Sequence, residues 1–271
     1  MRDIIKRGTN MKRFTLIVIL VTLLTSPGCN QSSQQANVSS SVISQPLTAS
    51  HLAAVSLDVQ ATGIHKQTIV RNDGTVLRFT ISIPDTYSDQ TPSPLIVALH
   101  YGGKVTPFYG RGIIDNLVGL ALAELDSIII APDSMGGDWR NETNEVAVIQ
   151  IMESVIQSYN VDKTKTLLTG FSMGGIGTWY LAGRNQDRFS AAIPIAGIPS
   201  TDTDWKIPLY IIHSRQDEVI PIKPTLQYVA ELKTKGADVE LVIIDGVTHY
   251  ETEGFAEPLR GAIPWIKKIW N

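Results

Sequence analysis

The chain has one cysteine, Cys29, among its 271 residues, and this scarcity excludes an intramolecular disulfide framework. Long hydrophobic runs are also missing. The apolar run from Phe14 to Leu24 is shorter than the roughly 20 residues that a transmembrane helix needs, so we do not expect it to span a membrane. We find no internal repeat and no cluster of residues with metal-ligand spacing. The glycine-rich stretches lack the Lys and Ser/Thr of a phosphate-binding loop. We therefore expect no metal and no other cofactor.

The amino-terminal segment has the order of a secretory signal. Lys12 and Arg13 come before the apolar run, and small residues follow it up to Cys29. This order of basic, apolar and small residues predicts a signal peptide over residues 1–28. Its ending resembles a bacterial lipoprotein signal, in which the cysteine is lipidated and becomes the first mature residue. We therefore expect a membrane-anchored lipoprotein, either periplasmic or at the cell surface. Ser26-Pro27 stands where that family usually has Leu and a small residue, so secretion as a soluble protein is the alternative.

Residues 29–63 are expected to form a flexible tether, since the stretch from Asn30 to Ser50 is rich in Ser, Gln and Asn and has no apolar period. Removal of residues 1–28 takes away five basic residues and one acidic residue, which leaves 18 basic against 25 acidic residues and a net charge of −7. An acidic protein of this kind is not expected to bind nucleic acid or anionic lipid by charge. We expect membrane contact only through a lipid on Cys29.

Residues 64–271 have the pattern of one α/β domain. Asn72-Asp73-Gly74 separates two β-rich runs and predicts a leading antiparallel hairpin. Continuous apolar strands then alternate with amphipathic helices, which predicts a mostly parallel sheet with helices on both faces. We expect buried strands at 94–100, 127–132, 166–170, 191–197, 208–214 and 239–245, and helices near 112–125, 144–158, 173–184, 224–235 and 257–269.

A Gly-x-Ser-x-Gly pattern lies where one expected strand becomes a helix, at Gly170, Ser172 and Gly174. In such a sharp turn the serine backbone is strained, and close neighbours leave no room for β-carbons. The turn lifts the serine hydroxyl above the carboxyl edge of the sheet and puts it at a helix N-terminus, which favours developing negative charge. The pattern also occurs as an ordinary turn, but this placement predicts that Ser172 is a catalytic nucleophile.

A serine nucleophile needs a histidine that accepts its proton and an acid that orients the histidine, and in this architecture they follow in the order Ser, acid, His. Of the histidines, only His249 lies in a loop after the last expected strand, and we expect it to be the general base. Asp217, in the loop after the penultimate strand, is the expected acid. The other acids that we considered are less suitably placed: Glu218, Asp245, Asp202 and Asp204.

Two backbone N–H groups are needed to stabilise the oxyanion that forms when the serine attacks a carbonyl. Met173, which follows the nucleophile, is expected to give one. The stretch "ALHYGGK" (98–104) is expected to give the other through Gly102 or Gly103. It is similar to the His-Gly-Gly-Gly loop of esterases, with Tyr101 in place of the first glycine. We expect His100 to brace this loop by hydrogen bonding.

The stretch "GFSMGGIGTWYLAGRNQDRFSAAIPIAG" (170–197) resembles the elbow region of α/β-hydrolase esterases. The similarity is greatest to the group that contains feruloyl and acetylxylan esterases, polyhydroxybutyrate-depolymerase-like enzymes and predicted peptidases related to prolyl oligopeptidase. "HSRQDEVIP" (213–221) is similar to their His-Gly-x-x-Asp-x-x-Val-Pro acid loop, with Ser214 where glycine is usual. The resemblance spans about residues 67–270 and implies an α/β-hydrolase fold and serine hydrolase chemistry.

Only "IPSTDTDWKI" (198–207) stands where many members of this fold carry a cap domain, so we expect an open site. An open site suits a bulky or polymeric ester. Tyr101, Trp139 and Trp205 are expected to line its mouth and to stack on a sugar or phenyl ring, with ordinary aromatic packing as the alternative for the tryptophans. The expected function is a serine carboxylic-ester hydrolase that works through an acyl-enzyme. The alternatives are a peptidase of the prolyl-oligopeptidase type and a non-catalytic binding member of the fold.

Overall fold

The computed structural model describes residues 53–200 and 203–271. The predicted signal peptide over residues 1–28, the predicted lipidation site at Cys29 and most of the predicted tether lie outside the described residues. Within the described ranges, no helix is both long enough and apolar enough to cross a membrane.

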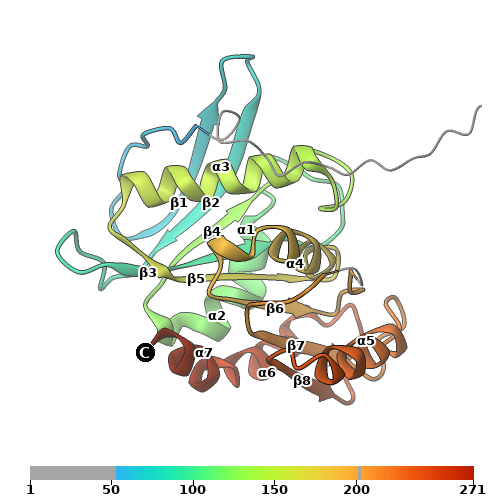
Figure 1. The fold of residues 1–271 in the computed structure, drawn as a ribbon. Helices are drawn as coiled ribbons and strands as arrows, with labels where there is room; N and C mark the ends of the chain where they lie inside the picture. The colour runs from blue at the N-terminus through green and yellow to red at the C-terminus, as the bar shows by residue number, and fades with distance from the viewer. Residues whose placement is uncertain (1–52, 201–202) are drawn as a thin grey trace, which may run out of the picture. The chain divides into compact units, whose positions relative to one another are not determined.

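An eight-stranded sheet forms the centre of the described domain (Figure 1), with the order β1-β2-β4-β3-β5-β6-β7-β8. The hairpin strands β1 and β2 pair antiparallel, β2 also pairs antiparallel with β4, and the remaining neighbours are parallel. The mostly parallel sheet with an antiparallel leading hairpin is therefore confirmed. The strands are β1 (Gly63–Val70), β2 (Val76–Ile83), β3 (Ser93–Leu99), β4 (Ile128–Pro132), β5 (Val161–Phe171), β6 (Ala191–Ile195), β7 (Leu209–Ser214) and β8 (Val239–Ile244).

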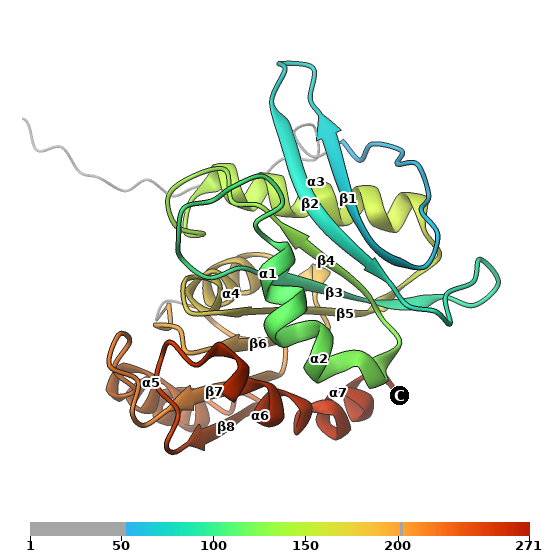
Figure 2. The same ribbon diagram turned by 180° about the vertical axis from the view of Figure 1, so that it is seen from behind.

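Helices cover both faces of the sheet. In Figure 1 the near face carries α3 (Glu142–Ser158), α4 (Met173–Arg184) and α5 (Lys223–Thr234). Figure 2 shows the opposite face with α1, α2, α6 and α7 in front of the sheet. Two of the expected helices are divided into shorter ones. The helix expected near 112–125 consists of α1 (Arg111–Ile113), the π-helix η2 (Ile114–Val118), α2 (Gly119–Leu122) and the 3₁₀-helix η3 (Ala123–Leu125). The carboxyl-terminal helix is divided into α6 (Ala256–Arg260) and α7 (Ile263–Trp270).

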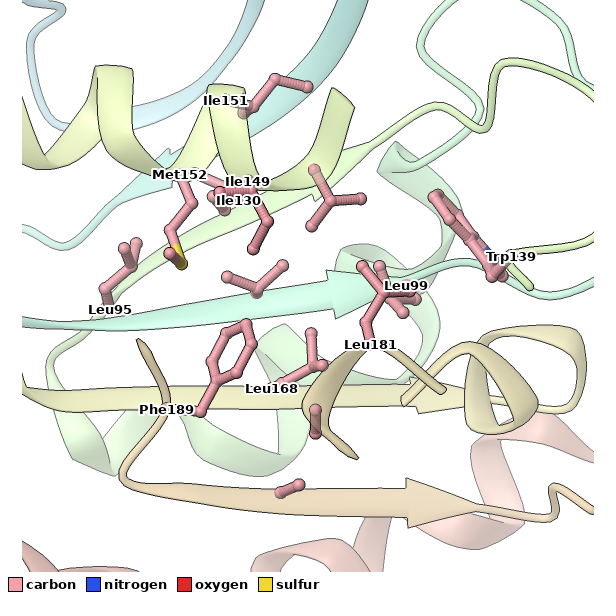
Figure 3. Packing of buried hydrophobic residues seen from close by; sticks show 14 of the residues in the cluster. Leu95, Leu99, Ile130, Trp139, Ile149, Ile151, Met152, Leu168, Leu181 and Phe189 are labelled. Atoms are coloured by element: carbon pink, nitrogen blue, oxygen red, sulfur yellow. The ribbon is translucent and has the colours of Figure 1, made fainter. Parts of the chain in front are cut away.

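Alternate residues of the central strands feed two separate hydrophobic clusters, one under each helical layer. Along β3, Leu95 and Leu99 belong to the cluster beneath α3 and α4, whereas Ile96 belongs to the cluster on the other face. Figure 3 shows the first cluster, in which Met152 of α3 and Leu181 of α4 point toward the sheet. Each fully buried side chain of this kind contributes roughly 1.5–3 kcal/mol to folding. The sheet that carries the site is therefore held rigidly from both sides.

The segment before β1 is packed against the domain. The backbone N–H groups of Val55 and Leu57 donate to the hydroxyls of Ser154 and Ser158 of α3 at 2.9 and 2.8 Å, and Leu57 is buried. The folded part thus begins before Ile64, where we had expected the tether to end. The polar composition upstream did not indicate this contact, because it depends on hydroxyls supplied by a helix about 100 residues later.

Candidate active site

The turn between β5 and α4 holds Ser172 in a conformation that few non-glycine residues adopt. Its φ and ψ angles are 56° and −116°, and the positive φ is a strain that the surrounding structure must impose. A β-carbon on Gly170 would lie 2.5 Å from the carbonyl oxygen of Gly174, and one on Gly174 would collide with the carbonyl oxygen of Leu99. Only glycine fits at both positions, as expected for a nucleophile elbow.

Three side chains predicted to act together meet at the carboxyl ends of the parallel strands. The Ser172 hydroxyl donates to His249 Nε2 at 2.7 Å. The Nδ1–H of the same ring donates to Asp217 Oδ2, also at 2.7 Å. Ser172 follows β5, Asp217 follows β7 and His249 follows β8, so the sheet itself sets their spacing.

Asp217 has both carboxylate oxygens occupied. While Oδ2 accepts from His249, Oδ1 accepts the backbone N–H groups of Val219 and Ile220 at 3.0 and 2.7 Å. The Asp217 side chain is completely buried. Buried charges require such compensation, and these donors fix the orientation of the carboxylate toward the imidazole.

Asp245, the competing acid, lies elsewhere. Its carboxylate pairs with Arg215 at 2.9 Å on the surface, and more than half of each side chain is exposed. Asp204 pairs with Lys206 and is also exposed, whereas Asp202 lies outside the described residues. The structure thus brings Asp217, and neither Asp245 nor Asp204, to the histidine.

Three contacts that the sequence did not indicate tie the end of β7 and the acid loop (residues 215–222) to the histidine loop (residues 245–251). Ser214 Oγ donates to the carbonyl of Val247, the amide oxygen of Gln216 accepts the N–H of Gly246, and Glu218 accepts the backbone N–H of His249 at 3.0 Å. Ser214, which departs from the glycine of the acid-loop motif that the sequence resembles, therefore has a bracing contact. We had judged Glu218 less suitably placed than Asp217, and it does not contact the imidazole, but the parallel pairing of β7 and β8 brings its carboxylate to the backbone of the histidine loop.

His213 braces the acid loop from inside the sheet. Its Nε2–H donates to the carbonyl of Ile220 at 2.8 Å, and its Nδ1 accepts from the Thr225 hydroxyl at 3.0 Å. Burial lowers the pKa of this imidazole below its ordinary value, although the nearby Asp217 carboxylate opposes the effect. A neutral ring suits both hydrogen bonds, because one ring nitrogen donates and the other accepts.

The loop after β3 lies beside Met173, the residue that follows Ser172, and the assignment of Met173, Gly102 and Gly103 to an oxyanion hole stays a prediction. A β-carbon on Gly102 would be 4.0 Å from the Met173 side chain. Gly103 has a φ of 151°, and a side chain there would collide with the Tyr109 hydroxyl. The positive φ and the Tyr109 side chain thus favour glycine at position 103, and it is Gly102 that approaches Met173, the first residue of α4.

His100 braces this loop, as expected. Its Nδ1–H donates to the carbonyl of Tyr101 at 2.7 Å, and its Nε2 accepts the backbone N–H of Ser134 at 3.0 Å. Burial lowers the pKa of His100, which keeps the ring neutral and able to accept at Nε2.

The two tryptophans expected at the mouth are buried instead, so that prediction is wrong. Trp139 is fully buried, and its indole N–H donates to the carbonyl of His100 at 3.0 Å. Trp205 packs edge-on against Trp179 and donates to the Tyr228 hydroxyl at 3.1 Å. Burial is favourable for both indole rings, because each buries a large apolar surface and its N–H group still has a hydrogen-bond acceptor.

Other aromatic residues lie near the hydrogen-bonded group of Ser172, His249 and Asp217. Tyr101 is half-buried, its ring centroid lies 6.3 Å from that of Phe171, and its hydroxyl accepts from the Asn116 amide at 3.3 Å. Phe171 in turn lies 5.2 Å from the His249 ring. Tyr250 is 79% exposed beside His249. Neither Phe171 nor Tyr250 was predicted from the sequence, although each is adjacent in sequence to a predicted catalytic residue.

A cavity of about 460 Å³ lies among Asn116, Val247 and residues 250–254. The connection from β6 to β7 does not cover the sheet edge with further elements, since its described residues (196–200 and 203–208) contain neither helix nor strand. In the parts of the chain that the structure describes, no group of three or more His, Cys, Asp or Glu side chains is arranged to hold a metal ion.

The sequence matches known proteins over most of the folded part. The family model described as "Dienelactone hydrolase family" matches residues 84–263. A protein named "Probable feruloyl esterase C" from Aspergillus niger is 34% identical over 150 residues, which are 53% of this chain and 56% of that protein. "Feruloyl esterase C" from Emericella nidulans is 33% identical over 151 residues, with the same shares. The chain thus spans little more than half the length of these curated relatives.

Solved structures share the fold. A thermostable esterase superposes with a TM-score of 0.65 at 23% identity, covering 76% of this chain and 62% of the esterase. An S-formylglutathione hydrolase from Staphylococcus aureus gives a TM-score of 0.61 at 15% identity, covering 76% and 99%. These similarities support the α/β-hydrolase fold that the sequence predicts. With two thirds of its length matched by the family model, the chain belongs to the dienelactone hydrolase family.

Proposed function

We propose that this protein is a serine carboxylic-ester hydrolase whose nucleophile, general base and orienting acid are Ser172, His249 and Asp217. The observation that carries the proposal is the hydrogen-bonded chain from the Ser172 hydroxyl through both nitrogens of His249 to the Asp217 carboxylate. The strained backbone of Ser172 supports it further, because such strain is retained chiefly where it serves a function. This observation counts against a non-catalytic member of the fold.

In the proposed reaction Ser172 Oγ attacks the ester carbonyl while His249 Nε2 takes the hydroxyl proton. The N–H of Met173 and an N–H from Gly102 or Gly103 stabilise the oxyanion. His249 then gives its proton to the departing alcohol, which leaves an acyl-enzyme on Ser172. Water, activated by the same imidazole, releases the acid and restores the serine. Asp217 holds the ring in the required tautomer and stabilises its protonated form.

The proposed substrate is a bulky or carbohydrate-linked ester. The short, uncapped connection between β6 and β7 supports this, since it adds no secondary structure over the sheet edge in its described residues. The names of the relatives, which include feruloyl esterases and a bifunctional acetylxylan esterase/xylanase from Neocallimastix patriciarum, also support ester rather than amide substrates. We further propose export through the signal over residues 1–28, with a lipid anchor on Cys29.

A fluorophosphonate probe and a substrate panel test the proposal. The probe is expected to label the wild type and the control Ser88→Ala, and to leave Ser172→Ala unlabelled. Ser88 is a suitable control because it is a partly exposed serine in the loop before β3. p-Nitrophenyl, feruloyl-sugar and acetyl-sugar esters should be hydrolysed in preference to prolyl amides. Undiminished labelling or ester hydrolysis by Ser172→Ala would overturn the assignment, and a preference for prolyl amides would favour a peptidase.

A further inference from the structure

The cavity of about 460 Å³ adjoins the proposed general base. Val247 and Tyr250 line it and flank His249 in the histidine loop. Asn116 also lines the cavity and donates to Tyr101, whose ring lies edge-on to Phe171, and the Phe171 ring in turn lies next to that of His249. Its volume is within the range of small-molecule sites, so it has room for a whole substituent of a substrate.

The chemistry of ester cleavage decides which half of the substrate faces this cavity. A general base that accepts the serine proton must later deliver it to the oxygen of the leaving alcohol. That oxygen therefore sits close to His249 Nε2, and the substituents of the alcohol extend over the neighbouring residues of the histidine loop. Since Val247 and Tyr250 lie in that loop, the cavity faces the alcohol half rather than the acyl half.

The cavity walls carry negative charge and an exposed aromatic ring. Glu251 accepts the backbone N–H of Thr248 at 2.6 Å, and this bond lowers the pKa of its carboxyl. Glu253 is exposed, with no side-chain partner among the described residues. No lysine or arginine is among the described residues that line the cavity. Tyr250 adds an aromatic ring, whose quadrupole also attracts cations to its face.

We propose that this cavity holds the alcohol half of the ester and selects it by charge, favouring a cationic group over a neutral one and disfavouring an anionic one. The inference rests on the proposed esterase function and adds a specificity that the function does not require. Glu253 is the residue whose charge is most directly available to the substrate, because the Glu251 carboxylate already accepts from Thr248.

Three acetate esters of similar size test the proposal: acetylcholine, its neutral isostere 3,3-dimethylbutyl acetate, and 4-acetoxybutanoate. At low ionic strength kcat/KM should fall in that order, by about 3- to 10-fold per step for charges several ångströms apart near a protein surface. Salt at about 0.5 M should compress the differences. Glu253→Gln should reduce the cationic-to-neutral ratio about threefold, whereas Glu231→Gln, an exposed glutamate of α5, should leave the ratio unchanged.

A ratio near one in the wild type, an unchanged ratio in Glu253→Gln, or an equal loss in Glu231→Gln would overturn the cavity assignment alone, provided that the neutral ester is hydrolysed through Ser172. A wild type that hydrolyses esters of the p-nitrophenyl, feruloyl-sugar and acetyl-sugar panel through Ser172 but none of these three acetates would likewise overturn the cavity assignment alone. If the wild type hydrolyses no ester of that panel and none of the three acetates, the proposed function itself fails and the inference fails with it.

Discussion

The carboxylate of Glu218 accepts a hydrogen bond from the backbone N–H of His249 at 3.0 Å. Its neighbour Asp217 meanwhile accepts from the ring of the same histidine. Two successive acids of one loop thus hold two different parts of one residue in the next loop. Because backbone and ring are both fixed, the imidazole has little freedom to turn away from Ser172.

Glu218→Ala should lower kcat about 10-fold with little change in KM, because the loss of a hydrogen bond to a charged group costs roughly 1.5–3 kcal/mol where the geometry depends on it. Glu218→Gln keeps an acceptor oxygen and should recover most of the activity. Steady-state kinetics on one p-nitrophenyl ester measure both variants. If the glutamine variant were as impaired as the alanine variant, Glu218 would act through its charge and not by positioning His249.

The two aspartates of these loops should behave very differently. Asp217→Asn is expected to lower kcat by about 10⁴-fold, because the amide favours the wrong imidazole tautomer. Asp245→Asn loses only a surface ion pair with Arg215 and should stay within about tenfold of the wild type. Measured kcat values for both, with circular dichroism to verify folding, make the comparison. A reversed outcome would mean that Asp245 orients the histidine.

These catalytic assignments came from the sequence because strand order and loop position suffice to align a serine, an acid and a histidine in this fold. The β-rich and apolar runs likewise predicted the sheet, since a buried strand and its covering helix both follow from local periodicity. The need for glycine at positions 170 and 174 could also be predicted, because a turn this sharp around a serine leaves no room for β-carbons at those two positions.

What the sequence did not disclose depends on contacts between distant segments. Trp139 looked available for substrate, yet the close approach of Gly177 and His100 encloses it. The hydrogen bond from the backbone of His249 to Glu218 forms only because β8 is the strand that pairs with β7. Similarly, the hydroxyls of α3 order residues 55–57, which composition alone assigned to a tether. A local sequence pattern does not specify which side chains come into contact across the fold, and each of these three features depends on such a contact.

Gly174→Ala should be strongly destabilising. Its β-carbon would collide with the carbonyl oxygen of Leu99, and backbone atoms on neighbouring elements have little room to move. We expect a loss of roughly 1–3 kcal/mol or more, as for other overpacked sites. Gly74→Asn is the matched control, since Gly74 has open space around it and asparagine tolerates its positive φ. Denaturant titration measures both, and equal stability of the two variants would contradict the steric account of the elbow.

Stability should fall as the pH drops from about 7.5 to 5.5. Burial lowers the pKa of His100 in the folded state, whereas in the unfolded state the ring titrates near 6.5. Below that pH the imidazole is protonated in the unfolded chain but still neutral in the folded one, so proton binding stabilises the unfolded state. One such histidine contributes up to about 1.4 kcal/mol at one pH unit below its unfolded pKa.

Denaturant titrations of the wild type and His100→Gln at both pH values measure this effect. The variant should lose part of the pH dependence whatever its stability at pH 7.5, and the remainder is expected from His213, whose pKa burial also lowers. An identical pH dependence in variant and wild type would show that His100 does not contribute.

The last prediction concerns Cys29. If the signal is of the lipoprotein type, the mature chain begins at this residue with two acyl chains on its side chain, and two chains hold a protein firmly where one gives only marginal binding. The net charge of −7 after removal of residues 1–28, from 18 basic and 25 acidic residues, adds no attraction to anionic lipid. Cys29→Ala should therefore move the protein from the membrane to the soluble fraction, or block processing, and leave ester hydrolysis unchanged. Fractionation, N-terminal sequencing and activity assays measure these outcomes. A wild-type protein that is soluble and begins at another residue would instead mean simple secretion, in keeping with the unusual Ser26-Pro27.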